Sequence, residues 1–453
     1  MRRSRLLLFA IVLGFYLSAP NVTNTDAYLS VPTAVSILHS ASLELDQFSS
    51  PVVKAHYGYS EVNGHHYDRF PWAVALLFVP GVAIVDLFGH LGIGSGAHAL
   101  VETNHMGPLQ LVTASVVTAL AAVAVAVVAY ERLSGTASRR RRVSFAVGLV
   151  FALGTSAWST ASRALWQHGP SMLALALALL ATSRLQRGDR PRSMAAALGV
   201  AVAGAYVLRP TNAIAIAGFT LLVALRHRRQ LAPYLVSLLS VLAVFVAVNV
   251  AAYGLVLPGY FSAGRISAHG AYVEALLANL VSPARGLLVF SPVVALSMAG
   301  FLLQVRRRTL SPLDSIAAAC VVAQLLVVSA QNEGWWAGHA FGPRFMSDVF
   351  PFLAYLSIPA AEALLGALRT STPTVWARMA AGAAALAAVV SVGINAQGAY
   401  LRSSTCWNSR PVDIDVRPAR TWDVEDPQIL AGFRAIGTDG LRDAMLGACP
   451  SAP

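Results

Sequence analysis

The sequence predicts an all-α polytopic membrane protein: a bundle of about 11 transmembrane helices with a long first extracytoplasmic loop that carries juxtamembrane helices. Three observations support this fold class. Hydrophobic residues make up 56% of the 453-residue chain, and charged residues only 12%. Apolar runs of the length that crosses about 30 Å of hydrocarbon recur from end to end. Arginines gather in short clusters between these runs, as in cytoplasmic loops.

The first apolar run, LLLFAIVLGFYL, follows the basic start MRRSR. It is either a retained first span or a cleaved signal peptide, because the run is short and ends in Ser18-Ala19-Pro20. In both cases residue 21 emerges outside. The predicted spans are 5–20, 108–130, 144–162, 170–185, 193–208, 211–225, 231–254, 286–304, 312–330, 346–366 and 376–395.

The apolar stretch 71–89 is the ambiguous segment. If it crossed the membrane, the next span would leave the four arginines 139–142 outside, against the positive-inside rule. Pro71, Pro80 and the interrupting Asp86 favour a segment that lies along or dips into the outer leaflet. The topology therefore favours leaving 71–89 out of the spans.

The charges divide unequally between the two sides of this topology. The inner loops receive 20 of the 33 basic residues, and the first outer loop and the C-terminal tail together hold 14 of the 21 acidic residues. The net charge of +12 consequently marks inner loops rather than a nucleic-acid surface, which would need one basic soluble face. We expect a multi-pass protein of the bacterial inner (plasma) membrane with its C-terminus and its functional face outside.

Two domains follow from this topology. Residues 1–395 form a transmembrane domain, whose first extracytoplasmic loop is 22–107, and residues 396–453 form a small extracytoplasmic tail. Cys406 and Cys449 both lie in the tail, where an oxidising compartment would allow a disulfide; two unpaired thiols are the alternative. Cys320 lies in an apolar segment and is expected to be packing.

Candidate chemistry is concentrated in the outward-facing segments. Isolated cations at a membrane boundary need partners, and either lipid headgroups or a bound anion would supply them. Several outward arginines facing an acidic loop favour a pocket for an anion such as a lipid phosphate. These arginines are 163, 209, 265, 285 and 344.

The outer loops also contain tryptophans and histidines, which are residue types that bind sugars and metals. Trp335-Trp336 is either an interfacial aromatic pair or a platform for a sugar ring. His56, His65 and His66 with Glu61 or Asp68 match no established metal-ligand spacing, so no metal and no cofactor is predicted.

The sequence resembles the C-type (GT-C) membrane glycosyltransferases over roughly residues 20–350. An acid just after the first span, a long outer loop with a proline-started apolar helix, and arginine-rich inner loops carry the resemblance. Similar families are the protein O-mannosyltransferases, the lipid A aminoarabinose transferases and the mycobacterial mannosyl- and arabinosyltransferases. The similar phrases are NTDAYLSVPTA, YGYSEVNGHHYDRFPWAVALL, SRALWQHG, LRPTN, SPARGLLVFSP and WWAGHAFGPRF.

This resemblance implies a catalytic acid/base role for Asp26 and a phosphate-binding role for Arg344. Arg209, Arg285 and Arg163 are further candidates for the donor phosphate. Several relatives carry Asp-Glu where this chain has Thr25-Asp26, and His-Pro-Pro where it has Arg69-Phe70-Pro71, which leaves the acceptor type open. The residues expected to contact the donor or acceptor sugar are Tyr28, Glu61, His168, Trp335, Trp336 and His339.

Elementary chemistry agrees with that role. No nucleotide sugars exist outside the inner membrane, so the donor is expected to be a sugar, of the mannose or arabinofuranose class, on a polyprenyl phosphate. Its acceptor would be a hydroxyl of an envelope glycan, lipid or protein. A carboxylate takes the acceptor proton and arginines stabilise the leaving phosphate, with inversion at the anomeric carbon.

Two other functions and a purely structural role for Asp26 remain open. Asp26 could serve only as a helix cap or an arginine partner. A transporter or flippase of a lipid-linked sugar would want acids or broken helices at the bilayer midplane, and the spans contain few ionisable groups. A non-catalytic membrane scaffold is the third possibility.

Overall fold

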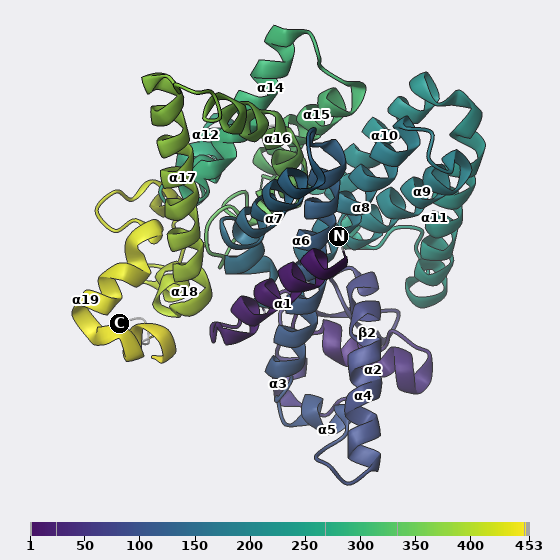
Figure 1. Ribbon diagram of the computed structural model, residues 1–453. Helices are drawn as coiled ribbons and strands as arrows, with labels where there is room; N and C mark the ends of the chain where they lie inside the picture. The colour runs from purple at the N-terminus through teal and green to yellow at the C-terminus, as the bar shows by residue number, and fades with distance from the viewer. Residues whose placement is uncertain (1, 24, 268, 333, 448, 450–453) are drawn as a thin grey trace.

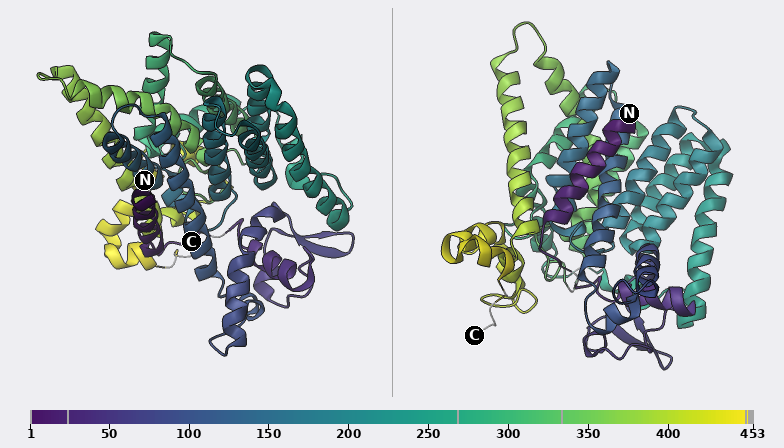
Figure 2. Two further views of the ribbon diagram at one scale, coloured as in Figure 1. Left: turned by 45° about the vertical axis from the view of Figure 1, so that its right-hand side comes forward. Right: turned by 60° about the horizontal axis from the view of Figure 1, so that its bottom comes forward.

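The computed structural model describes residues 2–23, 25–267, 269–332, 334–447 and 449. It is a bundle of roughly aligned helices, with two smaller bodies at one end (Figures 1 and 2). A helix overlaps each predicted span, in some cases over only part of it. These helices are α1 (Arg2–Ser18), α6 (Gly107–Arg132), α7 (Ala137–Leu153), α8 (His168–Gln186), α9 (Pro191–Leu208), α10 (Ala213–Arg226), α11 (Leu231–Tyr253), α14 (Ala295–Arg307), α15 (Pro312–Ser329), α16 (Phe350–Ala367) and α17 (Val375–Tyr400).

Membrane-crossing length and apolarity are met by only some of these helices. Six helical segments of the described chain are long and apolar enough to cross a membrane. They are Gly107–Arg132, Pro191–Leu208, Arg228–Tyr253, Pro312–Ser329, Arg344–Ala367 and Val375–Tyr400. The chain is a multi-pass membrane protein, and the count of about 11 spans stays a prediction.

The ambiguous stretch 71–89 forms two short helices, η1 (Trp72–Leu77) and α4 (Val79–His90). The 12 residues of α4 rise only about 18 Å, too little to cross a bilayer. Helix α4 packs on α2 (Ser30–Ser40) and on α5 (Ala97–Glu102). These elements and α3 (Pro51–Lys54) fold around a core of their own that includes Leu29, Leu45 and Phe78.

The first loop also contains a β-hairpin, which the all-α prediction missed. Strand β1 (Tyr59–Val62) pairs antiparallel with β2 (His65–Asp68), and Tyr59 lies opposite Asp68. Asn63 and Gly64 between the strands both have positive φ, 54° and 83°. Asn-Gly is a favoured pair for a two-residue turn whose twist suits a hairpin. The signal was present in the sequence as VNGH.

The arginine-rich loops meet at one end of the bundle, whereas the first loop and the C-terminal segment lie at the other end (Figures 1 and 2). Arg132 pairs with Asp314 at 2.6 Å, and Arg184 pairs with Glu131 at 2.8 Å. These ion pairs draw the loops together. The predicted segregation of charge is therefore a feature of the fold; which end faces outward stays a prediction.

The C-terminal segment folds as a small helical unit beside α17. It consists of α18 (Ser403–Cys406), η9 (Trp407–Ser409), η10 (Pro418–Trp422) and α19 (Gln428–Leu446). Cys406 and Cys449 form a disulfide bond across 43 positions of sequence. The Gln397 side chain of α17 accepts a hydrogen bond from the Gly432 amide and donates one to the Ile429 carbonyl, which fixes α19 against the bundle.

Candidate active site

A cavity of about 580 Å³ opens at the end of the bundle where the first loop and the C-terminal segment lie. Its polar wall carries four arginines and two aspartates, and its apolar wall comes from helix ends and loops. The charged residues are Asp26, Arg69, Arg209, Arg265, Arg344 and Asp415, and the apolar ones include Ile214, Val327 and Phe345. A positively charged pocket beside an apolar wall suits an anionic headgroup joined to a hydrocarbon chain.

Asp26 lies in the turn that leads from α1 into α2, and its side chain is 22% exposed to the cavity. One carboxylate oxygen, Oδ2, accepts a hydrogen bond from Arg344 Nη1 at 2.9 Å. The other oxygen accepts a hydrogen bond from the Tyr57 hydroxyl. Burial, with the negative charge of Asp26 adding to it, raises the pKa of Tyr57 well above its usual value, so the phenol stays a donor.

Arg344 begins the helical turn η8 (Arg344–Val349) directly after Gly342 and Pro343. Its guanidinium lies 4.4 Å from the centre of the Trp166 ring and 5.1 Å from that of Phe345. Stacking on aromatic rings and the bond to Asp26 hold the cation at the cavity wall. The Trp166 indole in turn donates to the Thr23 carbonyl at 2.5 Å, three residues before Asp26.

A second charged group lies beside this pair. Arg209 Nε is 2.7 Å from Asp348 Oδ2, and His168 Nδ1 is 3.4 Å from the same oxygen. Asp348 and His168 are almost completely buried, and only Arg209 lines the cavity. The ion pair with Asp348 partly neutralises the charge of Arg209 and fixes the orientation of its guanidinium.

Arg69 and Arg265 complete the basic wall. Both side chains are exposed at the cavity, and neither has a carboxylate within 4.0 Å among the residues that the structure describes. Within the part of the chain that the structure describes, they are the cavity arginines that form no ion pair. In the sequence, Arg265 belongs to the outward arginines considered for an anion, whereas Arg69 is one of the polar residues of the first outer loop and has no assigned role.

Arg163 and Arg285 lie away from the cavity, contrary to their expected role at the donor phosphate. Both are fully buried. Arg163 donates to the Ala19 and Tyr16 carbonyls at 2.7 and 2.5 Å, where α1 runs toward Asp26. Arg285 donates to the Trp336 and Gly338 carbonyls and to the side chains of the C-terminal segment. Both arginines satisfy main-chain carbonyls, and this role leaves no charge facing the cavity.

The predicted sugar-binding residues are scattered. Tyr28 is buried, donates to Asn104 at 2.7 Å and stacks on His56. Glu61 is exposed on the hairpin, and Trp335 is buried against Ala275 and Ala278. The remaining three lie behind the cavity wall or at its rim: His168, Trp336 and His339. None of the six lines the cavity.

Trp336 and His339 meet the C-terminal segment at the rim. Trp336 Nε1 donates to Asp415 Oδ1 at 2.6 Å, and His339 Nε2 lies 2.9 Å from Asp413 Oδ1. Asp415 itself lines the cavity. Sequence analysis missed Asp415, Tyr57 and Arg69, although YGY at 57–59 and DRF at 68–70 lie within phrases already singled out.

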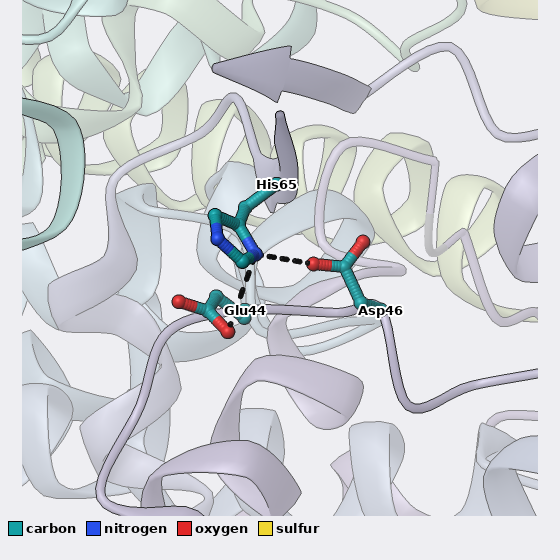
Figure 3. Close-up of side chains that lie close together, drawn as sticks. All are labelled: Glu44, Asp46 and His65. Atoms are coloured by element: carbon teal, nitrogen blue, oxygen red, sulfur yellow. Dashed lines mark hydrogen bonds and ion pairs between the residues drawn. The ribbon is translucent and has the colours of Figure 1, made fainter. Parts of the chain in front are cut away.

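Two groups of side chains have a geometry that can hold a metal ion. In Figure 3, the side chains of Glu44, Asp46 and His65 converge: His65 Nδ1 is 3.0 Å from Asp46 Oδ2 and 3.6 Å from Glu44 Oε2. The second group is His339, Asp413 and Asp415. In each group the histidine nitrogen lies within 4.0 Å of both carboxylates.

Comparison with known proteins gives a fold but no sequence family. No family model and no curated protein matches the chain. Among solved structures, ArnT from Cupriavidus metallidurans bound to undecaprenyl phosphate has a TM-score of 0.53 at 14% identity, covering 98% of this chain and 77% of that one. The archaeal oligosaccharyltransferase AglB from Archaeoglobus fulgidus, in complex with an inhibitory peptide and a dolichol-phosphate, has a TM-score of 0.51 at 13% identity.

The chain has a GT-C-like fold. The AglB match covers 87% of this chain and 56% of AglB. In this fold, the cavity lined by Asp26 and Arg344 lies at the end of the bundle that carries the long first loop.

Proposed function

We propose that this protein is an integral-membrane glycosyltransferase that moves a sugar from a polyprenyl-phosphate carrier to a hydroxyl of a cell-envelope acceptor. The observation that carries the proposal is the convergence of Asp26 and Arg344 on one basic cavity, at 2.9 Å from each other. The GT-C-like fold and the polyprenyl-phosphate ligand of the ArnT structure support the choice of carrier. The donor sugar is proposed to belong to the mannose or arabinofuranose class.

The donor is proposed to lie with its phosphate among the arginines and its isoprenoid chain along the apolar wall. Among the described residues, no carboxylate lies within 4.0 Å of the Arg265 or Arg69 guanidinium, and Arg344 and Arg209 extend the same basic surface. Ile214, Val327 and Phe345 line the apolar side. A phosphate ester that loses its sugar gains negative charge, so preorganised guanidinium groups stabilise the transition state more than the ground state.

Asp26 is proposed to be the general base. The acceptor hydroxyl oxygen attacks the anomeric carbon while the bond from that carbon to the phosphate oxygen breaks. The hydroxyl proton passes to Asp26, and the polyprenyl phosphate leaves with the bonding electron pair. Attack opposite the leaving phosphate inverts the anomeric centre. Tyr57 and Arg344 orient the carboxylate through one hydrogen bond to each of its oxygens.

In the membrane, we propose the topology of about 11 spans with the cavity on the extracytoplasmic side of the bacterial inner membrane. The support is the segregation of the arginine-rich loops to the opposite end of the bundle. No metal ion is assigned a part in the reaction.

The test uses the full-length protein in lipid nanodiscs with radiolabelled undecaprenyl-phosphate mannose and decaprenyl-phosphate arabinofuranose and delipidated envelope fractions as acceptors. We expect transfer by the wild type and a loss of at least about 10³-fold with Asp26→Asn. Glu274→Gln makes the same chemical change at an exposed residue of α12 (Tyr272–Val281), outside the cavity, and is expected to keep the rate.

The same preparations separate an enzyme from a lipid-sugar flippase. In proteoliposomes, a flippase would move the labelled donor between leaflets without changing it chemically. Wild-type rates of transfer by Asp26→Asn, or donor movement without any transfer, would overturn the proposal.

A further inference from the structure

A second cavity, of about 300 Å³, adjoins the first at the β-hairpin. The two cavities share five lining residues: Arg69, Phe70, Tyr260, Phe261 and Arg265. Phe70 and Tyr260 meet edge to face at 5.5 Å between ring centres. An aromatic edge therefore separates the two cavities, and Arg69 and Arg265 line both of them.

The lining of the second cavity combines aromatic faces with a few polar groups. Tyr67, Trp72 and Tyr253 are buried in it, and Tyr67 meets Tyr253 edge to face at 4.9 Å. Ser60 and Asp68 supply a hydroxyl and a carboxyl. The volume is at the low end of the roughly 300–1,000 Å³ typical of ligand pockets, which suits a ring rather than a lipid chain.

Asp68 is the buried polar group that the proposed reaction leaves unused. It ends strand β2, and it is 4% exposed. Its Oδ1 accepts a hydrogen bond from the Phe70 amide at 3.0 Å, and this is the only hydrogen bond of its side chain among the described residues. The second oxygen is therefore free to bind a ligand group in the cavity.

We propose that this second cavity is the acceptor subsite and that it binds a carbohydrate ring, with the Asp68 side chain donating a hydrogen bond to one ring hydroxyl. The proposal rests on the proposed function, because it places the acceptor in the cavity that adjoins the one lined by Asp26. Hydroxyl-bearing rings fit a pocket in which aromatic faces cover the carbon skeleton and a few fixed polar groups bind the hydroxyls. An acyl chain or an apolar peptide side chain would leave the carboxyl unpaired.

The protonation of Asp68 follows from its surroundings. Burial, with the negative charge of Asp26 adding to it, raises the pKa of the Asp68 carboxyl to about 8, against the opposing Phe70 hydrogen bond and the positive charge of Arg69. At neutral pH the group is therefore mostly a neutral donor. The charged and titratable groups that face Asp68 or line its cavity are Asp26, Arg69, Arg265, Tyr67, Tyr253 and Tyr260.

The test measures the binding of methyl glycosides (α-mannoside, β-glucoside, β-galactoside and α-arabinofuranoside) to the full-length protein in nanodiscs by saturation-transfer-difference NMR. We expect at least one glycoside to bind the wild type at pH 7 and to be released as the pH rises from 7 to 9.5. Asp68→Asn keeps a neutral donor and acceptor in the same shape, so its binding should persist through pH 9.5. Asp68→Ala should weaken binding by about tenfold or more at pH 7.

Two further variants distinguish a loss of glycoside binding from a loss of folded protein. Leu255→Trp adds bulk at an exposed residue of the cavity mouth and should block the glycoside without lowering the melting temperature. Leu239→Trp, at an exposed site of α11 outside both cavities, is the matched control and should bind normally. Saturating undecaprenyl phosphate should leave the glycoside signal in place, because the carrier is assigned to the first cavity.

Each outcome bears on one proposal or the other. Binding of undecaprenyl phosphate without binding of any glycoside would overturn the acceptor subsite and leave the transferase proposal standing. Loss of both would overturn the transferase proposal. Unchanged glycoside binding by Asp68→Ala, or wild-type binding that is constant up to pH 9.5, would remove Asp68 from the subsite.

Discussion

Arg344 donates a hydrogen bond to Asp26 at 2.9 Å, although 318 positions of sequence separate the two residues. The pair joins the turn after α1 to the turn before α16, so the fold itself brings a carboxylate and a guanidinium to one cavity. Trp166 stacks on the cation and anchors the chain before Asp26 through the Thr23 carbonyl. If Asp26 served only as a helix cap, the contact of Trp166 with Arg344 would not be required.

Arg344→Gln should reduce kcat/KM of the proposed transfer by about 10²–10³-fold, because one preorganised charge at the leaving phosphate is lost. Arg344→Lys keeps the charge but not the planar stacking on Trp166, so it should recover part of the activity. Steady-state transfer kinetics measure both. Arg402→Gln, at an exposed residue outside the cavity, is the control, and an effect as large as that of Arg344→Gln would contradict the assignment.

Arg285→Met should lower stability by roughly 3 kcal/mol or more, because several buried acceptors lose their donor. The donor KM of the folded fraction should stay unchanged, since Arg285 faces the C-terminal segment and not the cavity. Thermal unfolding and donor titration test the two statements. Arg228→Met, at an exposed residue between α10 and α11, should change neither. A raised donor KM would restore Arg285 to the phosphate site.

Asp68 makes the stability of the protein depend on pH. Its pKa is raised from 3.8 to about 8 in the folded protein, so between these values the folded state holds a proton that the unfolded state has released. Stability therefore falls as the pH rises from about 4 to 8, by at most about 1.4 kcal/mol per pH unit. The Asp68→Asn variant has no titratable group at this position, so its stability should not show this decrease with pH.

The difference in melting temperature between Asp68→Asn and the wild type should therefore grow from pH 5 to pH 8 and then level off. Differential scanning fluorimetry of both proteins in one buffer series measures it. A difference that stays constant over this range would show that Asp68 is not buried in its neutral form.

Removal of divalent metal should leave transfer unchanged within about twofold, because guanidinium groups supply the positive charge at the phosphate. Glu44, Asp46 and His65 lie outside the cavity, so His65→Ala should be equally neutral for activity. Transfer before and after dialysis against EDTA tests this prediction. Activity lost with EDTA and restored by Mn²⁺ would assign the reaction a metal, and His339→Ala would then show whether the second group holds it.

Sequence patterns predicted the parts of this molecule that depend on local chemistry. Apolar run lengths and arginine clusters located the helices and the charge segregation, and the position of Asp26 after the first span indicated the site. Asp26 and Arg344 do meet. The hairpin was missed because its four-residue strands are short and only partly alternate, although Asn63-Gly64 signalled the turn.

The residues that sequence analysis misplaced depend on contacts between distant segments. The sequence alone does not distinguish an arginine that donates to main-chain carbonyls from one that binds a phosphate. Arg163 and Arg285 donate to main-chain carbonyls. Their partners lie 144 and 51 positions away in sequence. The burial of Asp68 could not be predicted for the same reason, because it results from packing of the hairpin against the end of α11.

The cavity wall includes Asp415, which belongs to the segment that the Cys406–Cys449 disulfide closes. A ribosome that has released α1 through α17 into the bilayer has therefore not yet supplied every wall of the cavity. Assembly of the cavity therefore depends on the packing of this disulfide-closed segment against the rest of the bundle.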